Sequence, residues 1–148
     1  MILKEDSTEQ KLRGAYYTPL KLAEKMVDFF KKDASVKSIL EPSCGDGVFV
    51  DALVETQFLT QNRKVTAIEI EKNEAQKVAE KLKNNPNVSV VNRDFFEFYQ
   101  KYKDINKYDL ILGNPPYIRY QYLEEKQRME MAEILTSHGM KANKLINT

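Results

Sequence analysis

Residues 113–117, Gly-Asn-Pro-Pro-Tyr, form a rigid polar corner directly after the apolar run DLIL. Pro115 and Pro116 fix the backbone and donate no hydrogen bond, so the Asn114 side-chain oxygen and the nearby carbonyl groups are acceptors held in place. Tyr117 adds a flat aromatic face. Fixed acceptors beside an aromatic ring suit an exocyclic amine on a planar ring. The alternative is a proline turn that merely closes a strand.

A second cluster, LEPSCGDG, combines two acids with two glycines in residues 40–47. Gly45 and Gly47 allow a tight turn and a close approach of the backbone to a ligand. The pattern is neither the G-x-G-x-x-G dinucleotide fingerprint nor a phosphate-binding loop. Because Glu41 and Asp46 would repel phosphates, the cluster favours a ligand that carries cationic groups. The same residues also fit a tight strand–helix turn with a capping Asp.

Two further clusters, AIEIE and RDFF, also follow apolar runs. Glu69 can accept two hydrogen bonds from a ribose diol, with Ile70 as an apolar wall. Asp94 can accept from the amino group of a purine, with the aromatic ring of Phe95 stacked beside it. The alternatives are a surface glutamate at position 69 and a helix cap at position 94, with Phe95 in the core.

The elements that must position these clusters alternate between strands and helices. Apolar runs predict strands at residues 36–41, 64–70, 88–94 and 108–114. Amphipathic patterns predict helices at residues 18–32, 48–58, 72–83, 95–103 and from 120 to near Gly139. Asn84, Asn85 and Pro86 are predicted to end the third of these. In the first helix we expect Thr18 to be the N-cap and Pro19 the first helical residue. The side chains predicted to face inward are Leu20, Ala23, Val27, Phe30, Phe49, Leu53, Val54, Ala75, Val78, Ala79 and Leu82.

This alternation predicts an α/β fold with a doubly wound parallel sheet that has helices on both faces. In such sheets ligands bind beyond the carboxyl ends of the strands. Each of the four clusters falls at such an end, which is the main reason to expect a binding site there.

The composition sets limits on the kind of protein. The 148 residues are 42% hydrophobic and 30% charged, and no apolar stretch is long enough to span a membrane. A net charge of +1 shows none of the basic excess typical of a free-standing nucleic-acid binder. With Cys44 as the single cysteine and His138 as the single histidine, we expect no metal and a reducing, cytoplasmic setting. The polar residues 1–13 are predicted to be flexible.

The motifs GAYYTP, LEPSCGDG, AIEIE, RDFF and GNPPY occur in this order from Gly14 onward. In this the chain resembles the gamma class of S-adenosylmethionine-dependent DNA adenine-N6 methyltransferases of bacterial restriction–modification systems. The combination of YYTP and EPSCGDG is the more selective part. GNPPY alone is similar to corners in release-factor glutamine methyltransferases and some ribosomal RNA methyltransferases.

The resemblance implies a Rossmann-like fold and S-adenosyl-L-methionine as the cofactor. It assigns cofactor contacts to Tyr17, Thr18 and Pro19 (methionine end), Glu41, Ser43, Cys44 and Gly45 (central groove), Glu69 (ribose), Ile70 (adenine face), Asp94 (adenine amine) and Phe95 (adenine ring). It assigns the target adenine, flipped out of double-stranded DNA, to Asn114, Pro115, Pro116 and Tyr117.

The family's catalytic domain normally has seven strands, whereas four are predicted here. The resemblance implies the strand order 3-2-1-4, with the fourth strand at an edge. We therefore expect residues 14–148 to be the N-terminal portion of a catalytic domain without its target-recognition region, inactive alone. The chain would be a fragment, a truncated frame, or half of a split enzyme whose partner supplies the other strands and most DNA contacts.

Two alternative functions fit the same motifs. One is a methyltransferase that acts on a protein glutamine or on RNA, where an amide or amine would use the same corner. The other is a non-catalytic subunit that pairs with an active partner. The short segment ahead of GAYYTP disfavours the protein-modifying enzyme, and the intact motifs disfavour a degenerate subunit.

Overall fold

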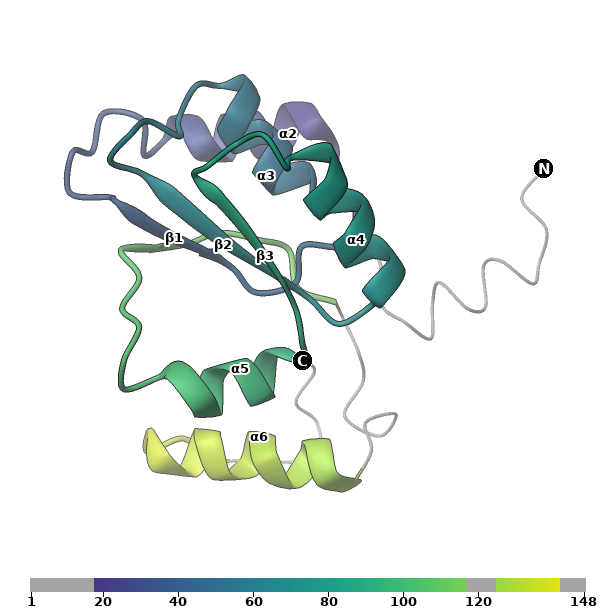
Figure 1. Ribbon diagram of the computed structural model, residues 1–148. Coiled ribbons are helices and arrows are strands. Elements are labelled where there is room, and N and C mark those ends of the chain that lie inside the picture. The colour runs from purple at the N-terminus through teal and green to yellow at the C-terminus, as the bar shows by residue number, and fades with distance from the viewer. Residues whose placement is uncertain (1–17, 117–124, 142–148) are drawn as a thin grey trace. The chain divides into compact units, whose positions relative to one another are not determined.

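A computed structural model describes residues 18–116 and 125–141 (Figure 1). The strands are β1 (Ser38–Glu41), β2 (Lys64–Glu69), β3 (Val88–Asn92) and β4 (Leu110–Ile111). The helices are α2 (Leu20–Asp28), α3 (Val48–Glu55), α4 (Lys72–Lys81), α5 (Phe95–Tyr102) and α6 (Glu125–Ser137). Residues 18–114 belong to one compact unit, and α6 belongs to a second one.

The four strands form one parallel sheet in the order β3-β2-β1-β4. Ile39 pairs with Val65 of β2 on one side and with Leu110 of β4 on the other. Because each connection between parallel strands carries a helix, the chain forms successive crossovers. The predicted α/β fold and the predicted strand order are confirmed.

The larger part of the core lies between the sheet and helices α2, α3 and α4, which cover the same face (Figure 1). Ala23 and Val27 of α2 and Leu53 of α3 pack there against Ile39 and Val65 of the sheet. The alternation of side chains along a strand sends every second residue to this face, so the apolar strands supply both sides of the sheet.

The opposite face of the sheet is covered by α5 (Figure 1). Phe98 of this helix packs in a second cluster with Leu40 of β1 and Ile68 of β2, and the rings of Phe98 and Tyr102 lie 4.8 Å apart. Helices therefore cover both faces of the sheet, as a doubly wound fold requires.

Several predicted boundaries were too wide. Helix α2 ends at Asp28 and α4 at Lys81, and β4 consists only of Leu110 and Ile111. Two inward-facing predictions also need correction, because Val54 is only half-buried and Ala79 is exposed. Helix α4 packs over β2 and β3 through a narrow apolar stripe that includes Ala75 and Val78. Ala79 lies beside this stripe and is therefore exposed to solvent.

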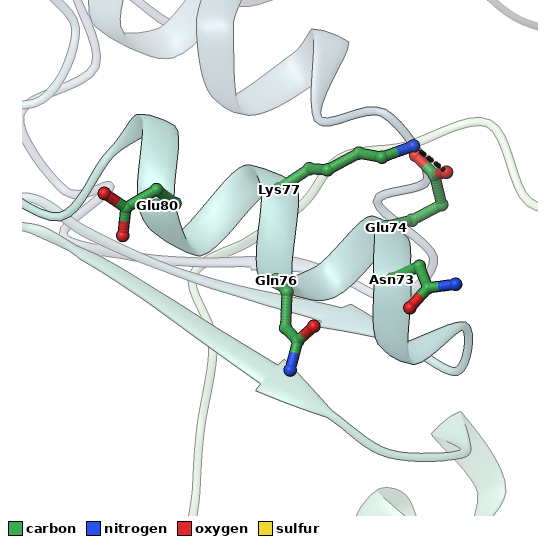
Figure 2. A pocket seen from close by; sticks show the side chains of 5 residues that line it. All are labelled: Asn73, Glu74, Gln76, Lys77 and Glu80. Atoms are coloured by element: carbon green, nitrogen blue, oxygen red, sulfur yellow. Dashed lines mark hydrogen bonds and ion pairs between the residues drawn. The ribbon is translucent and has the colours of Figure 1, made fainter.

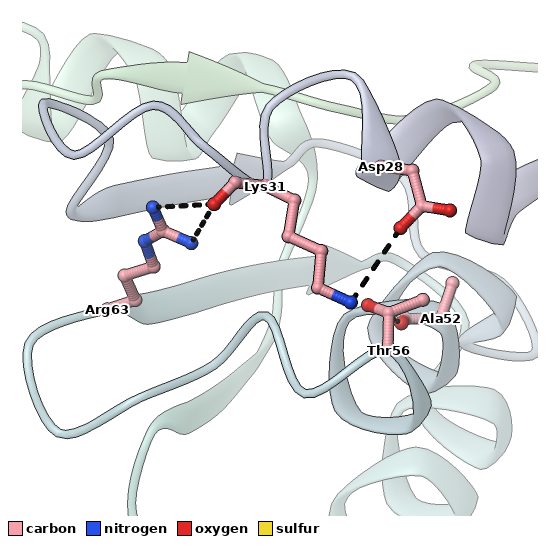
Figure 3. Close-up of polar contacts among 5 residues, drawn as sticks. All are labelled: Asp28, Lys31, Ala52, Thr56 and Arg63. Carbon is pink, nitrogen blue, oxygen red and sulfur yellow. Dashed lines mark hydrogen bonds and ion pairs between the residues drawn. The ribbon is translucent and has the colours of Figure 1, made fainter.

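Arg63 holds together the end of the sheet opposite to the strand carboxyl ends. Its Nε donates to the Val36 carbonyl at 3.0 Å, and its Nη2 donates to the Asp33 carbonyl at 2.6 Å. The guanidinium also donates to the Lys31 carbonyl at 3.4 and 3.5 Å (Figure 3) and lies 4.2 Å from the centre of the Phe58 ring. This clamp joins the segment after α2 to the start of β2.

Helix α6 ends as predicted near Gly139, whose φ of +74° is a left-handed conformation typical of a helix C-terminus. The Met140 amide donates to the Leu135 carbonyl at 2.9 Å and closes the last turn. Among the residues that the structure describes, no helix is both long and apolar enough to cross a membrane.

Candidate functional site

The sheet brings the predicted clusters to one edge. Glu41 ends β1, Glu69 ends β2, and both lie at the carboxyl end because the strands are parallel. Gly113 follows β4 so closely beside them that a Cβ at this position would lie 3.4 Å from Pro42 Cδ and 3.7 Å from Glu41 Cγ. The carboxyl ends of β1, β2 and β4 therefore form one continuous site.

The loop after β1 is a tight turn built on glycine. Gly47 has a φ of +83°, and its amide donates to the Cys44 carbonyl at 2.7 Å. A Cβ at Gly47 would lie 3.0 Å from both Cγ atoms of Val78 in α4, so both the backbone and the space require glycine. The Cys44 amide donates to the Ile68 carbonyl at 2.8 Å, which anchors the loop to β2.

Glu69 braces two loops at once. Its side chain is 8% exposed, Oε2 accepts from the Gly45 amide at 2.7 Å, and Oε1 accepts from the Glu71 amide at 2.8 Å. A carboxylate has about four lone-pair positions, so each oxygen retains a second position for a hydroxyl donor. Glu69 can therefore bind the ribose hydroxyls, as predicted, only in addition to the two backbone amides that it already accepts from.

Glu41 and Ser43 carry buried oxygens that lack a partner. Among the described residues, Glu41 Oε2 and Ser43 Oγ are the buried side-chain N or O atoms without a hydrogen bond. Burial is the main cause that raises the pKa of Glu41 to about 9, and the charges of Asp46, Asp51 and Glu69 add to it. Burial likewise raises the pKa of the Cys44 thiol, so Cys44 is no nucleophile at neutral pH.

Asp94 is the N-cap of α5, which was the alternative left open for it. Its Oδ1 accepts from the Phe96 amide at 2.8 Å and from the Glu97 amide at 3.2 Å. Both bonds use the same oxygen, so Oδ2 is still able to accept from a ligand. Phe95 is half-buried against the α5 side of the core, whereas Ile70 is 58% exposed and presents an apolar surface.

Asn92 is a site residue that the sequence reasoning missed. It ends β3, and its Nδ2 donates to the carbonyls of Glu69 at 2.8 Å and Ile70 at 2.9 Å. This amide fixes the carboxyl end of β2 and the residue that follows it. The only sequence signal is an amide directly ahead of RDFF, and its partners become clear only from the pairing of β2 with β3.

Thr18 does not cap α2. The N-cap is Pro19, which makes no side-chain cap bond, and Thr18 Oγ1 instead lies 3.3 Å from Asn114 Nδ2. This hydrogen bond ties the start of the Asn-Pro-Pro corner to the segment ahead of α2. Pro115 is exposed and Pro116 half-buried.

Two predicted site residues, Tyr17 and Tyr117, lie outside the described residues, as does the segment 1–13. Among the other predicted residues, Glu41 and Glu69 end β1 and β2, and Gly113, next to Asn114, lies beside Glu41. Asp94 and Phe95 follow β3 at the same edge of the sheet.

A shallow hollow on α4 offers no comparable chemistry. It is lined by Asn73, Glu74, Gln76, Lys77 and Glu80 of one helix (Figure 2). The Lys77 ammonium lies 2.7 Å from Glu74 Oε1, an ordinary pair of neighbouring side chains on a solvated helix face.

The chain is similar to a protein family, to individual proteins and to solved structures. A model of the family described as "Eco57I restriction-modification methylase" matches residues 8–145. The type II methyltransferase M.HincII of Haemophilus influenzae is 31% identical over 128 residues, which cover 86% of this chain. A tRNA1(Val) (adenine(37)-N6)-methyltransferase of Photorhabdus laumondii is 32% identical over 84 residues, which cover 55% of this chain and 33% of that protein.

The chain spans only 22% of the length of M.HincII. Among solved structures, an O-methyltransferase of Bacillus cereus in complex with SAH superposes with a TM-score of 0.57 at 15% identity. The match covers 75% of this chain and 51% of that one, and it shows the fold alone.

Proposed function

This chain belongs to the Eco57I restriction-modification methylase family, and on that basis we propose that it supplies the cofactor pocket and catalytic corner of a DNA adenine-N6 methyltransferase. The proposed cofactor is S-adenosyl-L-methionine, and the proposed acceptor is the exocyclic amine of an adenine flipped out of double-stranded DNA.

One observation carries this proposal. The unpartnered oxygens of Glu41 and Ser43 lie at the end of β1, and Gly113, next to Asn114, is in van der Waals reach of Glu41. A buried acceptor without a donor is costly, so these atoms favour a ligand that brings cationic or donor groups. The methionine end of the cofactor, with its ammonium and sulfonium, has those groups.

The rest of the cofactor would follow the strand ends. Glu69 would accept from the ribose hydroxyls with the second lone pair of each oxygen, and Ile70 would lie against the adenine ring. Asp94 Oδ2 would accept from the adenine amine while Oδ1 keeps its capping role. We also propose that Phe95 packs on the adenine ring of the cofactor. Cys44 and Gly45 would line the central groove of the pocket. The methionine end would be contacted by Tyr17, Thr18 and Pro19.

The cofactor, when bound, supplies a methyl group on a sulfonium. The Asn114 side-chain oxygen and the Pro115 carbonyl would accept the two hydrogens of the adenine N6 and make this nitrogen more tetrahedral. Its lone pair then points at the methyl group, and Tyr117 would stack on the flipped base. Pro116 keeps the corner rigid. Catalysis of this kind depends on positioning and electrostatics rather than on a general base.

We further propose that most DNA contacts and the remaining strands are supplied by other residues, in the same protein or in a complementing chain. Two observations support this: the chain spans about a fifth of the length of the type II methyltransferases M.HincII and M.HindII, and its net charge is only +1. Within the described residues β4 ends the sheet, so its outer edge can receive another strand.

The test is a chimera in which this chain replaces the matching region of M.HincII. We expect labelled methyl transfer to DNA, with N6-methyldeoxyadenosine as the product after digestion to nucleosides, and no transfer by the 148-residue chain alone. Clear activity of the chain alone would contradict the proposed need for further strands. A different methylated nucleoside would contradict the adenine-N6 assignment.

Asn114→Ala in this chimera is expected to lower turnover at least 100-fold, roughly the cost of losing one fixed acceptor in a transition state. Cofactor affinity, measured by calorimetry, should change less than about threefold, because Asn114 is assigned to the target base. A variant that keeps nearly full methylation would contradict this assignment.

An RNA adenine is the second candidate acceptor. The match to the tRNA1(Val) enzyme favours it, since that relative modifies an adenine N6 by its name. Offering the chimera and the isolated chain both DNA and transfer RNA separates the two candidates. Transfer to RNA by the isolated chain would favour the second.

A further inference from the structure

Glu41, at the end of β1, is a buried acid. Its side chain is 2% exposed, and Oε2 has no hydrogen-bond partner among the described residues. The Ser43 hydroxyl, two residues on, is buried and unpartnered as well. An ionised carboxylate in such a place would lose its hydration without gaining a partner, so the neutral acid is the favoured form.

The groups that surround Glu41 act in the same direction. Asp46 in the following loop, Asp51 of α3 and Glu69 of β2 are all acidic, and together with burial they raise the pKa of Glu41 to about 9. Lys81 of α4 donates to the Asp46 carbonyl at 3.3 Å and pairs with Asp51, with Nζ 2.7 Å from Oδ2. Cys44 interacts with Glu41 as well, and burial raises the pKa of its thiol, so it carries no charge at neutral pH.

We propose that binding of S-adenosylmethionine removes the proton from Glu41, so that cofactor affinity is coupled to pH; this rests on the proposed function. The O–H bond of the neutral Glu41 acid breaks, and the proton passes to solvent. The carboxylate that remains pairs with a cationic group of the ligand. The ammonium and sulfonium of the ligand are offset in part by its carboxylate, so the ligand brings a net charge of +1. One proton leaves as it binds, and the net charge of the pocket is conserved.

The coupling has a defined size. If one proton leaves for each ligand bound, the dissociation constant falls about tenfold for each unit by which the pH rises, as long as the pH is below the Glu41 pKa. Between pH 6.0 and 7.5 the affinity should therefore rise about 30-fold. A neutral ligand such as 5′-methylthioadenosine lacks both the ammonium and the sulfonium, so it does not stabilise the ionised form of Glu41. Its affinity should therefore not depend on the protonation of Glu41.

The test is calorimetry at pH 7 in two buffers of different ionisation enthalpy, with the full 148-residue chain. The difference in heat gives the number of protons released. We expect about one proton with S-adenosylmethionine and none with 5′-methylthioadenosine. Binding of S-adenosylmethionine without proton release would overturn this inference and leave the proposed cofactor intact. Absence of binding would overturn both.

Glu41→Gln keeps the shape of the neutral acid and is expected to fold. With S-adenosylmethionine it should release no proton, and its affinity should change less than about threefold from pH 6.0 to 7.5. Glu80→Gln, an exposed residue of α4, is the matched control and should behave as the unmodified chain does. Equal proton release in the unmodified chain and in Glu41→Gln would also overturn the inference.

Discussion

Gly47 shows how much of the site depends on the conformation of one residue. It lies in the left-handed region with φ +83°, and a Cβ there would lie 3.0 Å from Val78. Gly45, two residues earlier, has φ +53° but nothing within 4 Å of its Cβ position. Gly47 is therefore required by both its backbone conformation and the lack of space, whereas Gly45 is favoured by its backbone conformation alone.

Gly47→Ala is expected to lower the free energy of unfolding by roughly 2–3 kcal/mol, since a left-handed alanine costs about 1 kcal/mol and the contact with Val78 adds to it. Gly45→Ala is the matched control and should cost only the backbone part, about 1 kcal/mol. Urea denaturation of both variants gives the difference. Equal losses would show that Val78 adapts to the extra methyl group.

The carboxyl group of Glu41 makes stability depend on pH in a direction opposite to that of most acids. Its pKa is raised from 4.5 to about 9 on folding, so the folded chain holds the proton more tightly than the unfolded chain does. Stability from this group is complete below pH 4.5 and is lost as the pH rises toward 9.

Glu41→Gln should therefore be more stable than the unmodified chain at neutral pH, with a difference that grows between pH 5 and 8 by up to about 1.4 kcal/mol per pH unit. Thermal unfolding at pH 5.5, 6.5 and 7.5 measures it, with Glu80→Gln as the control. A difference that is constant with pH would contradict the raised pKa.

At the scale of the elements, the carboxyl ends of β2 and β3 are joined by a side chain in addition to the backbone hydrogen bonds between the two strands. Asn92 Nδ2 donates to two successive carbonyls, those of Glu69 and Ile70. Both of these residues are assigned to the adenosine half of the cofactor. If the proposed contacts hold, the position of that half would depend on Asn92, which does not itself belong to them.

Asn92→Asp replaces the donor with a carboxylate that faces two carbonyl oxygens. Because Asn92 is exposed, we expect a loss of about 0.5–1.5 kcal/mol in stability. We also expect a weaker affinity for 5′-methylthioadenosine, which contains the adenosine half alone. Asn84→Asp, at an exposed position after α4, is the control. Below about pH 4 the new acid is protonated and can donate again, so the defect in stability should shrink there. A defect of equal size at all pH values would argue against the lost donation as its cause.

The strands and the edge that carries the candidate site could be predicted from the sequence, because apolar runs and their spacing determine them locally. The order of the strands was implied by the family resemblance and not by these local patterns. The roles of Asn92 and Thr18 could not. Asn92 depends on the register between β2 and β3, and the bond between Thr18 and Asn114 joins residues 96 positions apart. Ala79 was misjudged because helical spacing alone does not tell how wide a stripe the sheet covers.

For the molecule as a whole, the open question is the outer edge of β4. Leu112 donates to the Leu40 carbonyl at 2.9 Å, so the backbone alternation turns the N–H and C=O of Ile111 away from β1. The Ile111 side chain is 66% exposed. Within the described residues no strand lies beyond β4, and an apolar strand edge of this kind is a template for pairing with another chain.

We therefore expect the 148-residue chain to self-associate at high concentration, and Ile111→Lys to reduce that association severalfold, because a charge on an edge strand opposes pairing. Sedimentation velocity over a range of concentrations measures it. Ile105→Lys is the matched control, since Ile105 is 74% exposed but lies outside the strand. If both substitutions reduce association equally, general surface hydrophobicity and not the β4 edge drives it. A chain that stays monomeric throughout would show that the edge is already covered.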